Sequence, residues 1–155
     1  MLLGTYFETN DGSLPEIEIH FSQFDQSRAA FEFLFSAGAV DATVGGATLW
    51  SISAASELPF VGKDAALSVL AGEVEPFHVV LAGIKLANTE IPNLGVFYDP
   101  LSLTFDYRMG SSWGEPEVHS LIFLLKKFVE LGGTIEVPWW GINGQIDFSA
   151  AIKNV

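Results

Sequence analysis

Apolar residues recur with two different periods along this 155-residue chain, and this mixture limits the folds that it can adopt. Residues 16–21 alternate strictly between polar and apolar side chains, which predicts a strand with one buried face. Residues 118–129 place apolar side chains three and four positions apart, which predicts an amphipathic helix. Both segments must bury one side only, so helices packed on a sheet would satisfy them together.

Two principal helices are predicted. The first covers residues 22–37, with Ser22 as its N-cap, Asp25 as the acidic partner of a capping box and Gly38 at its end. The second has Pro116 in its first turn and ends at a pair of glycines. The expected buried stripes consist of Phe24, Phe31, Leu34 and Phe35 in the first helix and Val118, Leu121, Ile122, Leu125, Phe128 and Val129 in the second.

Several shorter segments have patterns of their own. The predicted elements are a strand-like stretch at 42–53, a short helix at 64–71, an apolar strand at 77–86 and a hairpin at 95–108. The continuous apolar run at 77–86 is typical of a central strand that is covered on both faces. Near the C-terminus, Asn143 and Gly144 favour a second hairpin, which pairs residues 137–142 with 145–148.

The order of strand, helix, several strands, helix and hairpin lacks the regular alternation of a doubly wound sheet. It predicts an α+β fold, with a mainly antiparallel or mixed β-sheet and two principal helices packed on it. About five to seven strands are ordinary for this length. We expect a single domain over residues 1–155, because the chain has the length of one domain and no linker or repeat interrupts it.

Acidic residues dominate the charge. Nineteen Asp and Glu against seven Lys and Arg give a formal net charge of −12. Such a charge repels nucleic acid and anionic lipid, and it attracts a basic protein or a cation. It also keeps a chain with 49% hydrophobic residues in solution, which would explain the charge without any partner.

Other features of the sequence concern its location. The chain contains no cysteine, which excludes disulfides, zinc–thiolate sites and cysteine nucleophiles. No apolar run reaches the roughly 20 residues of a membrane span, and the first residues lack the pattern of a secretory signal. We expect a soluble, cytoplasmic protein that binds neither membrane nor nucleic acid.

The sequence contains no recognisable catalytic, metal or cofactor motif. Its most metal-like group is Glu16, Glu18 and His20, which share one strand face. Alternate residues of a strand stand roughly 6–7 Å apart, and one strand rarely supplies all the ligands of one ion. We therefore predict a solvent-facing polar strand with no tightly bound metal and no cofactor. The sequence favours a protein without catalytic activity but does not decide whether the chain is an enzyme.

Three further polar residues are candidates for a small site. Asp106 and Arg108 share one strand face, where they could form an ion pair or hold a substrate carboxylate. His119 lies four residues after Glu115 in the second helix and could serve as a general base. The simpler explanations are a structural ion pair and a surface histidine.

Three tryptophans are candidate partner-binding residues: Trp113, Trp139 and Trp140. The last two are adjacent, so in a strand their indoles point to opposite faces and at most one lies in the core. An exposed tryptophan often anchors a protein interface. The simpler explanation is that a loop or a chain terminus covers the second indole.

Two hypotheses follow for function. The first is a non-catalytic protein-binding module whose acidic surface attracts a basic partner, as in a bacterial toxin-neutralising immunity protein. The alternative is a small-molecule-binding protein or an unrecognised small enzyme. Its pocket would lie between the sheet and the long helix, lined by Asp106, Tyr107, Arg108, Trp113 and His119. A homo-oligomer is a third reading, because exposed apolar area can equally form a dimer.

Overall fold

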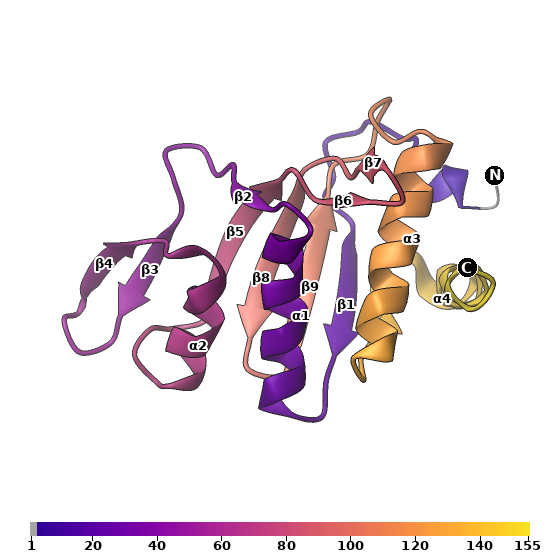
Figure 1. Cartoon of the computed structure of the whole chain (residues 1–155). Coiled ribbons are helices and arrows are strands. Elements are labelled where there is room, and N and C mark those ends of the chain that lie inside the picture. The colour runs from indigo at the N-terminus through magenta and orange to yellow at the C-terminus, as the bar shows by residue number, and fades with distance from the viewer. Residues whose placement is uncertain (1–2) are drawn as a thin grey trace.

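The computed structural model describes residues 3–155, which form a six-stranded sheet with helices packed on one face (Figure 1). All neighbouring strands are antiparallel. In spatial order the strands are β10 (Thr134–Glu136), β1 (Glu16–His20), β9 (Ser102–Tyr107), β8 (Leu94–Asp99), β5 (Phe77–Ala82) and β2 (Val40–Asp41). This confirms the predicted α+β fold with a mainly antiparallel sheet.

Two helices cover one face of the sheet, α1 (Phe24–Ser36) and α3 (Glu115–Glu130), and both were predicted (Figure 1). The N-cap of α1 is Gln23 rather than Ser22, so the predicted cap is one residue off. The side chain of Gln26 completes the capping box, because its Oε1 accepts the backbone N–H of Gln23. An amide thus takes the role that was expected of a carboxylate.

The buried stripes agree with the prediction at most positions. Fully buried members are Phe31, Leu34, Leu121, Leu125 and Phe128. The prediction is wrong for Phe24 and Val129, which are 57% and 42% exposed. Phe24 stands in the first turn of α1, and the buried residues of this helix begin about one turn later. Val129 lies in the last turn of α3, where it lines an open groove between α3, β10 and α4 (Gly141–Lys153).

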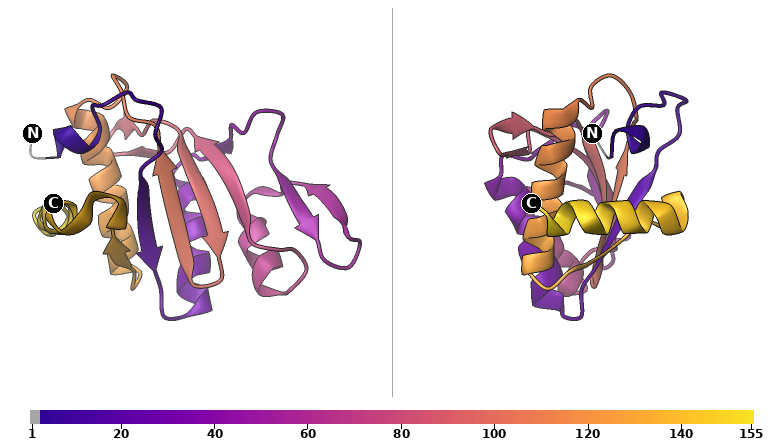
Figure 2. Two further views of the ribbon diagram at one scale, coloured as in Figure 1. Left: turned by 180° about the vertical axis from the view of Figure 1, so that it is seen from behind. Right: turned by 90° about the vertical axis from the view of Figure 1, so that its right-hand side faces the viewer.

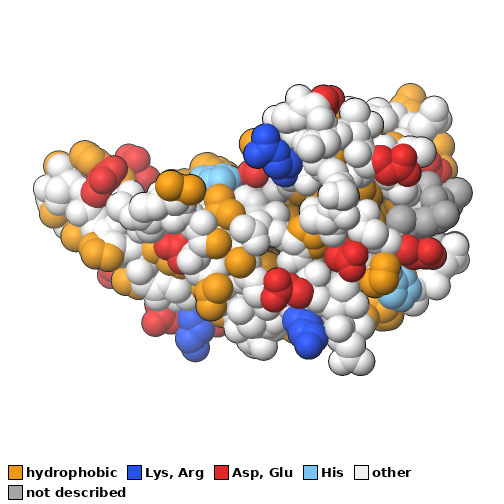
Figure 3. All heavy atoms as spheres, turned by 90° about the horizontal axis from the view of Figure 1, so that it is seen from above, with side chains coloured by type: hydrophobic (Ala, Val, Ile, Leu, Met, Phe, Trp, Pro, Cys, Tyr) orange, Lys and Arg blue, Asp and Glu red, His pale blue; other side chains and the backbone are white. Residues whose placement is uncertain are grey.

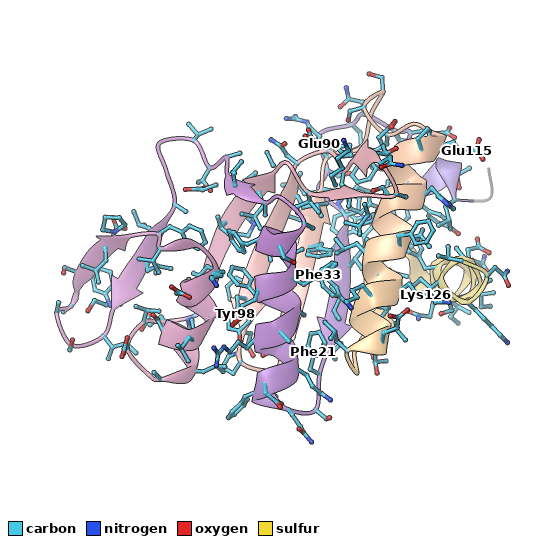
Figure 4. All side chains as sticks on the ribbon, viewed as in Figure 1. Phe21, Phe33, Glu90, Tyr98, Glu115 and Lys126 are labelled. Atoms are coloured by element: carbon cyan, nitrogen blue, oxygen red, sulfur yellow. The ribbon has the colours of Figure 1, made fainter. Side chains whose placement is uncertain are left out.

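The core lies between the helices and the inward side chains of the sheet. Tyr98 on β8 is fully buried, and its hydroxyl lies 2.9 Å from Oγ of Ser27 on α1. The Ser27 hydroxyl also donates to the carbonyl of Pro100 at 2.7 Å. Figure 4 shows Tyr98 beside α1, on the side towards α2, and Phe33 between α1 and α3. These contacts join α1 to the turn between β8 and β9.

The strand β5 is not covered on both faces, so that part of the prediction is wrong. Val79 and Leu81 are buried on the helix side, whereas His78 is exposed on the other side. The end of the apolar run forms β6 (Lys85–Leu86), which pairs with β7 (Thr89–Glu90) near the top of α3 (Figure 1). The predicted hairpin at 95–108 is confirmed as β8 and β9.

The segment between β2 and β5 lies at one end of the sheet (Figure 1). Within the strand-like stretch 42–53, the strand β3 (Thr48–Ser51) pairs with β4 (Ser56–Pro59) in a separate two-stranded sheet. The predicted short helix is confirmed as α2 (Ala65–Leu70), which follows the 3-10 turn η2 (Gly62–Asp64). None of the helices among residues 3–155 is long and apolar enough to cross a membrane.

The hairpin predicted near the C-terminus is wrong. The 3-10 turn η3 (Pro138–Trp140) leads directly into α4 (Gly141–Lys153), so the Asn-Gly pair lies inside a helix. Phe148 and Ile152, one turn apart, are buried. Phe148 packs against aromatic rings of the N-terminal segment, which contains the 3-10 turn η1 (Gly4–Tyr6). Tertiary burial therefore outweighs the local turn preference.

The helix α4 also closes one edge of the sheet. Gln145 Nε2 donates to the carbonyl of Ile135, and its Oε1 accepts the N–H of Val137, both at 2.9 Å. Unpaired groups on an edge strand invite pairing with other chains, and this side chain satisfies two of them. Figure 2 shows α4 crossing this edge, with its first turn projecting past the sheet on the side away from α1 and α3.

Candidate functional site

The sheet face opposite α1 and α3 is left uncovered by those helices (Figure 2). Strand alternation sends every second side chain of the sheet to this surface. We call it the open face. Its side chains are Glu16, Glu18, His20, His78, Val80, Phe97, Asp99, Ser102, Thr104, Asp106, Thr134 and Glu136.

The open face concentrates acidic charge. Five of its side chains are carboxylates, and the six strands of the sheet contain no Lys or Arg. Cationic side chains lie elsewhere, such as Arg28 on α1, Lys126 on α3, Lys153 on α4 and Arg108 after the end of β9. Viewed from above, the molecule shows few and separate basic side chains (Figure 3). The electrostatic field over the open face is therefore negative.

Two pairs of carboxylates lie directly opposite each other on neighbouring strands. Glu16 faces Asp106, and Glu18 faces Glu136. Like charges in such positions are destabilising. Both members of the second pair lie near His20, whose Nε2 is 2.9 Å from Glu18 Oε1 and 3.6 Å from Glu136 Oε2.

The repulsion within the first pair, Glu16 and Asp106, is relieved by a residue on β5, two strands away from β9. His78 Nε2 on β5 lies 2.7 Å from Asp106 Oδ2 on β9, although β8 runs between them. Gly95 on β8 makes the contact possible, because a Cβ atom at this position would collide with the Asp106 carboxylate. The hydrogen bond to Asp106 raises the pKa of His78 above its ordinary value, against the opposing effect of partial burial, and the negative charge of Asp106 adds to the rise.

Two apolar features adjoin these charges. Phe97 on β8 is 40% exposed near the middle of the open face. At the β10 edge, Trp139, Ile142 and Ile146 are 50%, 79% and 61% exposed. We call these three residues the apolar ridge. Ile142 and Ile146 are one turn apart on the same side of α4, and the ridge begins where α4 projects past the sheet (Figure 2).

The three candidate tryptophans occupy different environments. Trp113 is buried in the core, and its Nε1 donates to the carbonyl of Arg108 at 2.9 Å. Trp140 is half-buried, and its Nε1 donates to the hydroxyl of Tyr107 at 3.0 Å. Trp139 is the exposed member of the adjacent pair. The two indoles point in different directions because of the 3-10 turn, not because of strand alternation.

The polar candidates are not brought together. Asp106 lies on the open face, whereas Tyr107 and Trp113 are buried on the helix side of the sheet. Arg108 is exposed just beyond β9, and His119 lies on α3 with its ring edge-on to an aromatic neighbour. The space between the sheet and the long helix is filled by core side chains. Asp106 pairs with a histidine from β5 rather than with Arg108.

A separate open groove of about 480 Å³ lies between α3, β10 and α4. Its lining includes Lys126, Ile135, Gln145 and Ile152. Gln145 is already engaged in closing the β10 edge. The candidate site residues from the sequence do not line this groove.

Sequence reasoning missed several residues of this surface. The outward positions of His78 and Asp106 follow from strand alternation, but their contact depends on the order of β5, β8 and β9. Glu136 joins Glu18 only through the pairing of β1 with β10. Ile142 was assigned to a hairpin, so its exposure on a helix was not foreseen.

The open face and the apolar ridge therefore form the candidate functional surface. No protein-family model, curated protein or solved structure matches this chain.

Proposed function

We propose that this chain is a non-catalytic protein-binding module that takes a basic protein partner on its open face. The observation that carries the proposal is the separation of charge, because five carboxylates share a surface whose strands hold no Lys or Arg. A field of one sign speeds the encounter with a partner of opposite sign and disfavours other partners. The overall charge of −12 strengthens this field.

The neighbouring apolar side chains can slow the dissociation of a partner, which charge alone does not do. Electrostatic attraction mainly raises the association rate, whereas buried aromatic anchors slow dissociation. Phe97 and Trp139 are 40% and 50% exposed, so each has area left to bury against a partner. The surface thus combines a means of fast encounter with a means of retention.

The engaged state of the polar side chains supports a binding role over catalysis. His78 is held by Asp106, and His20 stands between two carboxylates. In these positions the imidazoles are engaged with acidic neighbours on the sheet. The residues expected to line a pocket are dispersed over two sides of the sheet and the ends of strands.

A bacterial toxin-neutralising immunity protein is one class of binding module that would use such a surface, since acidic immunity surfaces meet basic effector domains. This narrower proposal has a test of its own. A reading frame directly beside the gene should encode a basic effector that this chain inactivates in a stoichiometric complex. A neighbourhood of metabolic enzymes would count against it.

The broader proposal is tested by affinity capture with two charge-matched variants. The open-face variant carries Glu16→Gln, Glu18→Gln and Glu136→Gln, and the control carries Glu57→Gln, Glu73→Gln and Glu75→Gln. The control residues are exposed around β3, β4 and the loop before β5, far along the sheet from β10. We expect a basic protein to be captured by the wild type and the control and to be lost from the open-face variant. Equal capture by both variants would place the interface elsewhere.

A further inference from the structure

The open face brings three metal-ligating side chains together. Glu18 and His20 come from β1, and Glu136 comes from β10. One ligand atom from each lies within 4.8 Å of the other two. Within residues 3–155 this is the one group of three or more His, Asp or Glu side chains that meets this spacing.

The second strand removes the objection that one strand cannot supply all the ligands. Glu16, which shares the strand face with Glu18 and His20, lies opposite Asp106 instead. Glu136 takes its place because the register sets it directly opposite Glu18. The three ligands are thus held by paired backbone on two adjacent strands.

The distances fit a small divalent ion. Zinc bonds of about 2.0–2.1 Å in tetrahedral geometry place neighbouring ligand atoms about 3.3 Å apart. His20 Nε2 lies 2.9 Å from Glu18 Oε1 and 3.6 Å from Glu136 Oε2, on either side of that value. The Glu18 and Glu136 oxygens lie within 4.8 Å of each other, and side-chain rotation would set their final spacing around a bound ion.

The local negative charge also favours the binding of a cation. Glu18 and Glu136 are like charges in directly opposite positions, which costs stability. The strands of the sheet contribute no Lys or Arg to offset them. The other histidine–carboxylate contact of the open face, His78 with Asp106, spans two strands and does not gather a third ligand within the same spacing.

We propose that Glu18, His20 and Glu136 bind one divalent transition-metal ion of the Zn²⁺ class, with water in the remaining position. An imidazole with two carboxylates is a mixed donor set that suits zinc, iron or nickel, whereas calcium and magnesium prefer oxygen ligands throughout. The side chains are 28% to 56% exposed, so the ion can enter from solvent. The site goes beyond the proposed function, because it binds the ion without a protein partner.

The test is titration calorimetry of tag-free protein with Zn²⁺, together with the visible absorption of added Co²⁺. The wild type should bind one ion, and bound Co²⁺ should give the strong visible bands of a four-coordinate site. His20→Asn and Glu136→Gln should each weaken Zn²⁺ binding by at least about tenfold, since loss of even an outer-shell partner costs that much. The matched controls His119→Asn and Glu57→Gln should bind as the wild type does.

A second readout protects the test from effects on folding. Glu136→Gln removes one of two opposing carboxylates, so the metal-free variant should unfold at the same or a higher urea concentration than the wild type. Added Zn²⁺ should stabilise the wild type and leave this variant unchanged. The proposal is overturned if the wild type binds no Zn²⁺, or if His20→Asn and Glu136→Gln bind it with wild-type affinity. Neither result bears on the capture of a basic protein.

Discussion

His78 and Asp106 meet at 2.7 Å across an intervening strand. Their contact joins β5 to β9 over the one residue of β8 that leaves room for it, Gly95. The contact relieves the repulsion between Asp106 and Glu16, and it fixes an imidazole at the middle of the acidic surface.

Replacing His78 should make stability depend less on pH. The hydrogen bond to Asp106 raises the pKa of His78 in the folded protein above the ordinary value of 6.5. Its stabilising contribution is therefore fully present below that ordinary value and is lost as the pH rises through the raised one. His78→Gln should lower the free energy of unfolding more at about pH 5.5 than at about pH 9.

The size of this effect should be below about 1 kcal/mol, because the His78 side chain is 45% exposed and solvent screens the contact. Urea unfolding at the two pH values measures it. His119→Gln, on the surface of α3, is the matched control and should lose nothing in this comparison. An equal loss for His78→Gln at both pH values would show that the contact does not titrate in this range.

Gly95→Ala should break the same contact without changing either partner. The added Cβ would displace the Asp106 carboxylate from its position over β8. In an NMR titration, the pKa of His78 should then move down towards its ordinary value of 6.5. An unchanged pKa in the folded variant would mean that the carboxylate reaches His78 by another path.

The exposure of Val129 can be tested against its buried neighbour. Leu125→Ala should cost about 2–5 kcal/mol in the free energy of unfolding, because it leaves a cavity at a fully buried position. Val129→Ala, one turn further along α3, should cost less than about 1 kcal/mol. Chemical denaturation of both variants gives the comparison. Similar losses would restore the wider buried stripe that the sequence predicts.

Substitutions of the two adjacent tryptophans should differ in their effect on stability, because Trp140 packs in the fold and Trp139 is a candidate binding residue. Trp140→Ala removes a donor to Tyr107 and a ring that packs against Tyr6, so it should cost about 3–5 kcal/mol. Trp139→Ala should leave the unfolding midpoint nearly unchanged, because its side chain is half exposed. Thermal and urea unfolding measure both. A strongly destabilised Trp139→Ala would mean that Trp139 is a packing residue and a poor choice of anchor.

Local periodicity was enough to predict much of the fold. Both principal helices, the hairpin of β8 and β9 and the strand β1 follow from alternation or helical spacing within single segments. The α+β class follows from their order. Such patterns report which side of an element is buried, and they do so well when the element packs on one neighbour only.

The C-terminal segment shows where local signals fail. Asn143 and Gly144 form a strong turn signal, yet Phe148 and Ile152 gain more by packing as one helical face. Gln145 then satisfies the free edge of β10, which a hairpin would have left to another strand. These gains come from residues far away in the sequence, so no local pattern contains them.

The candidate site was only partly predictable for the same reason. The polar side of β1 and an exposed tryptophan in the adjacent pair could be expected from the sequence. The joining of Glu18 to Glu136 and of His78 to Asp106 required the strand order. The polar side of one strand follows from its own sequence, whereas a surface depends on how several strands are paired.

The most direct test of the open face as an electrostatic docking surface is the salt dependence of association with the captured basic partner. The association rate constant is measured from about 50 to 300 mM salt for the wild type and the two charge-matched variants. The open-face variant (Glu16→Gln, Glu18→Gln, Glu136→Gln) should associate more slowly and with a flatter salt dependence. The control variant (Glu57→Gln, Glu73→Gln, Glu75→Gln) should stay close to the wild type. Equal slopes and rates for the two variants would contradict docking on the open face.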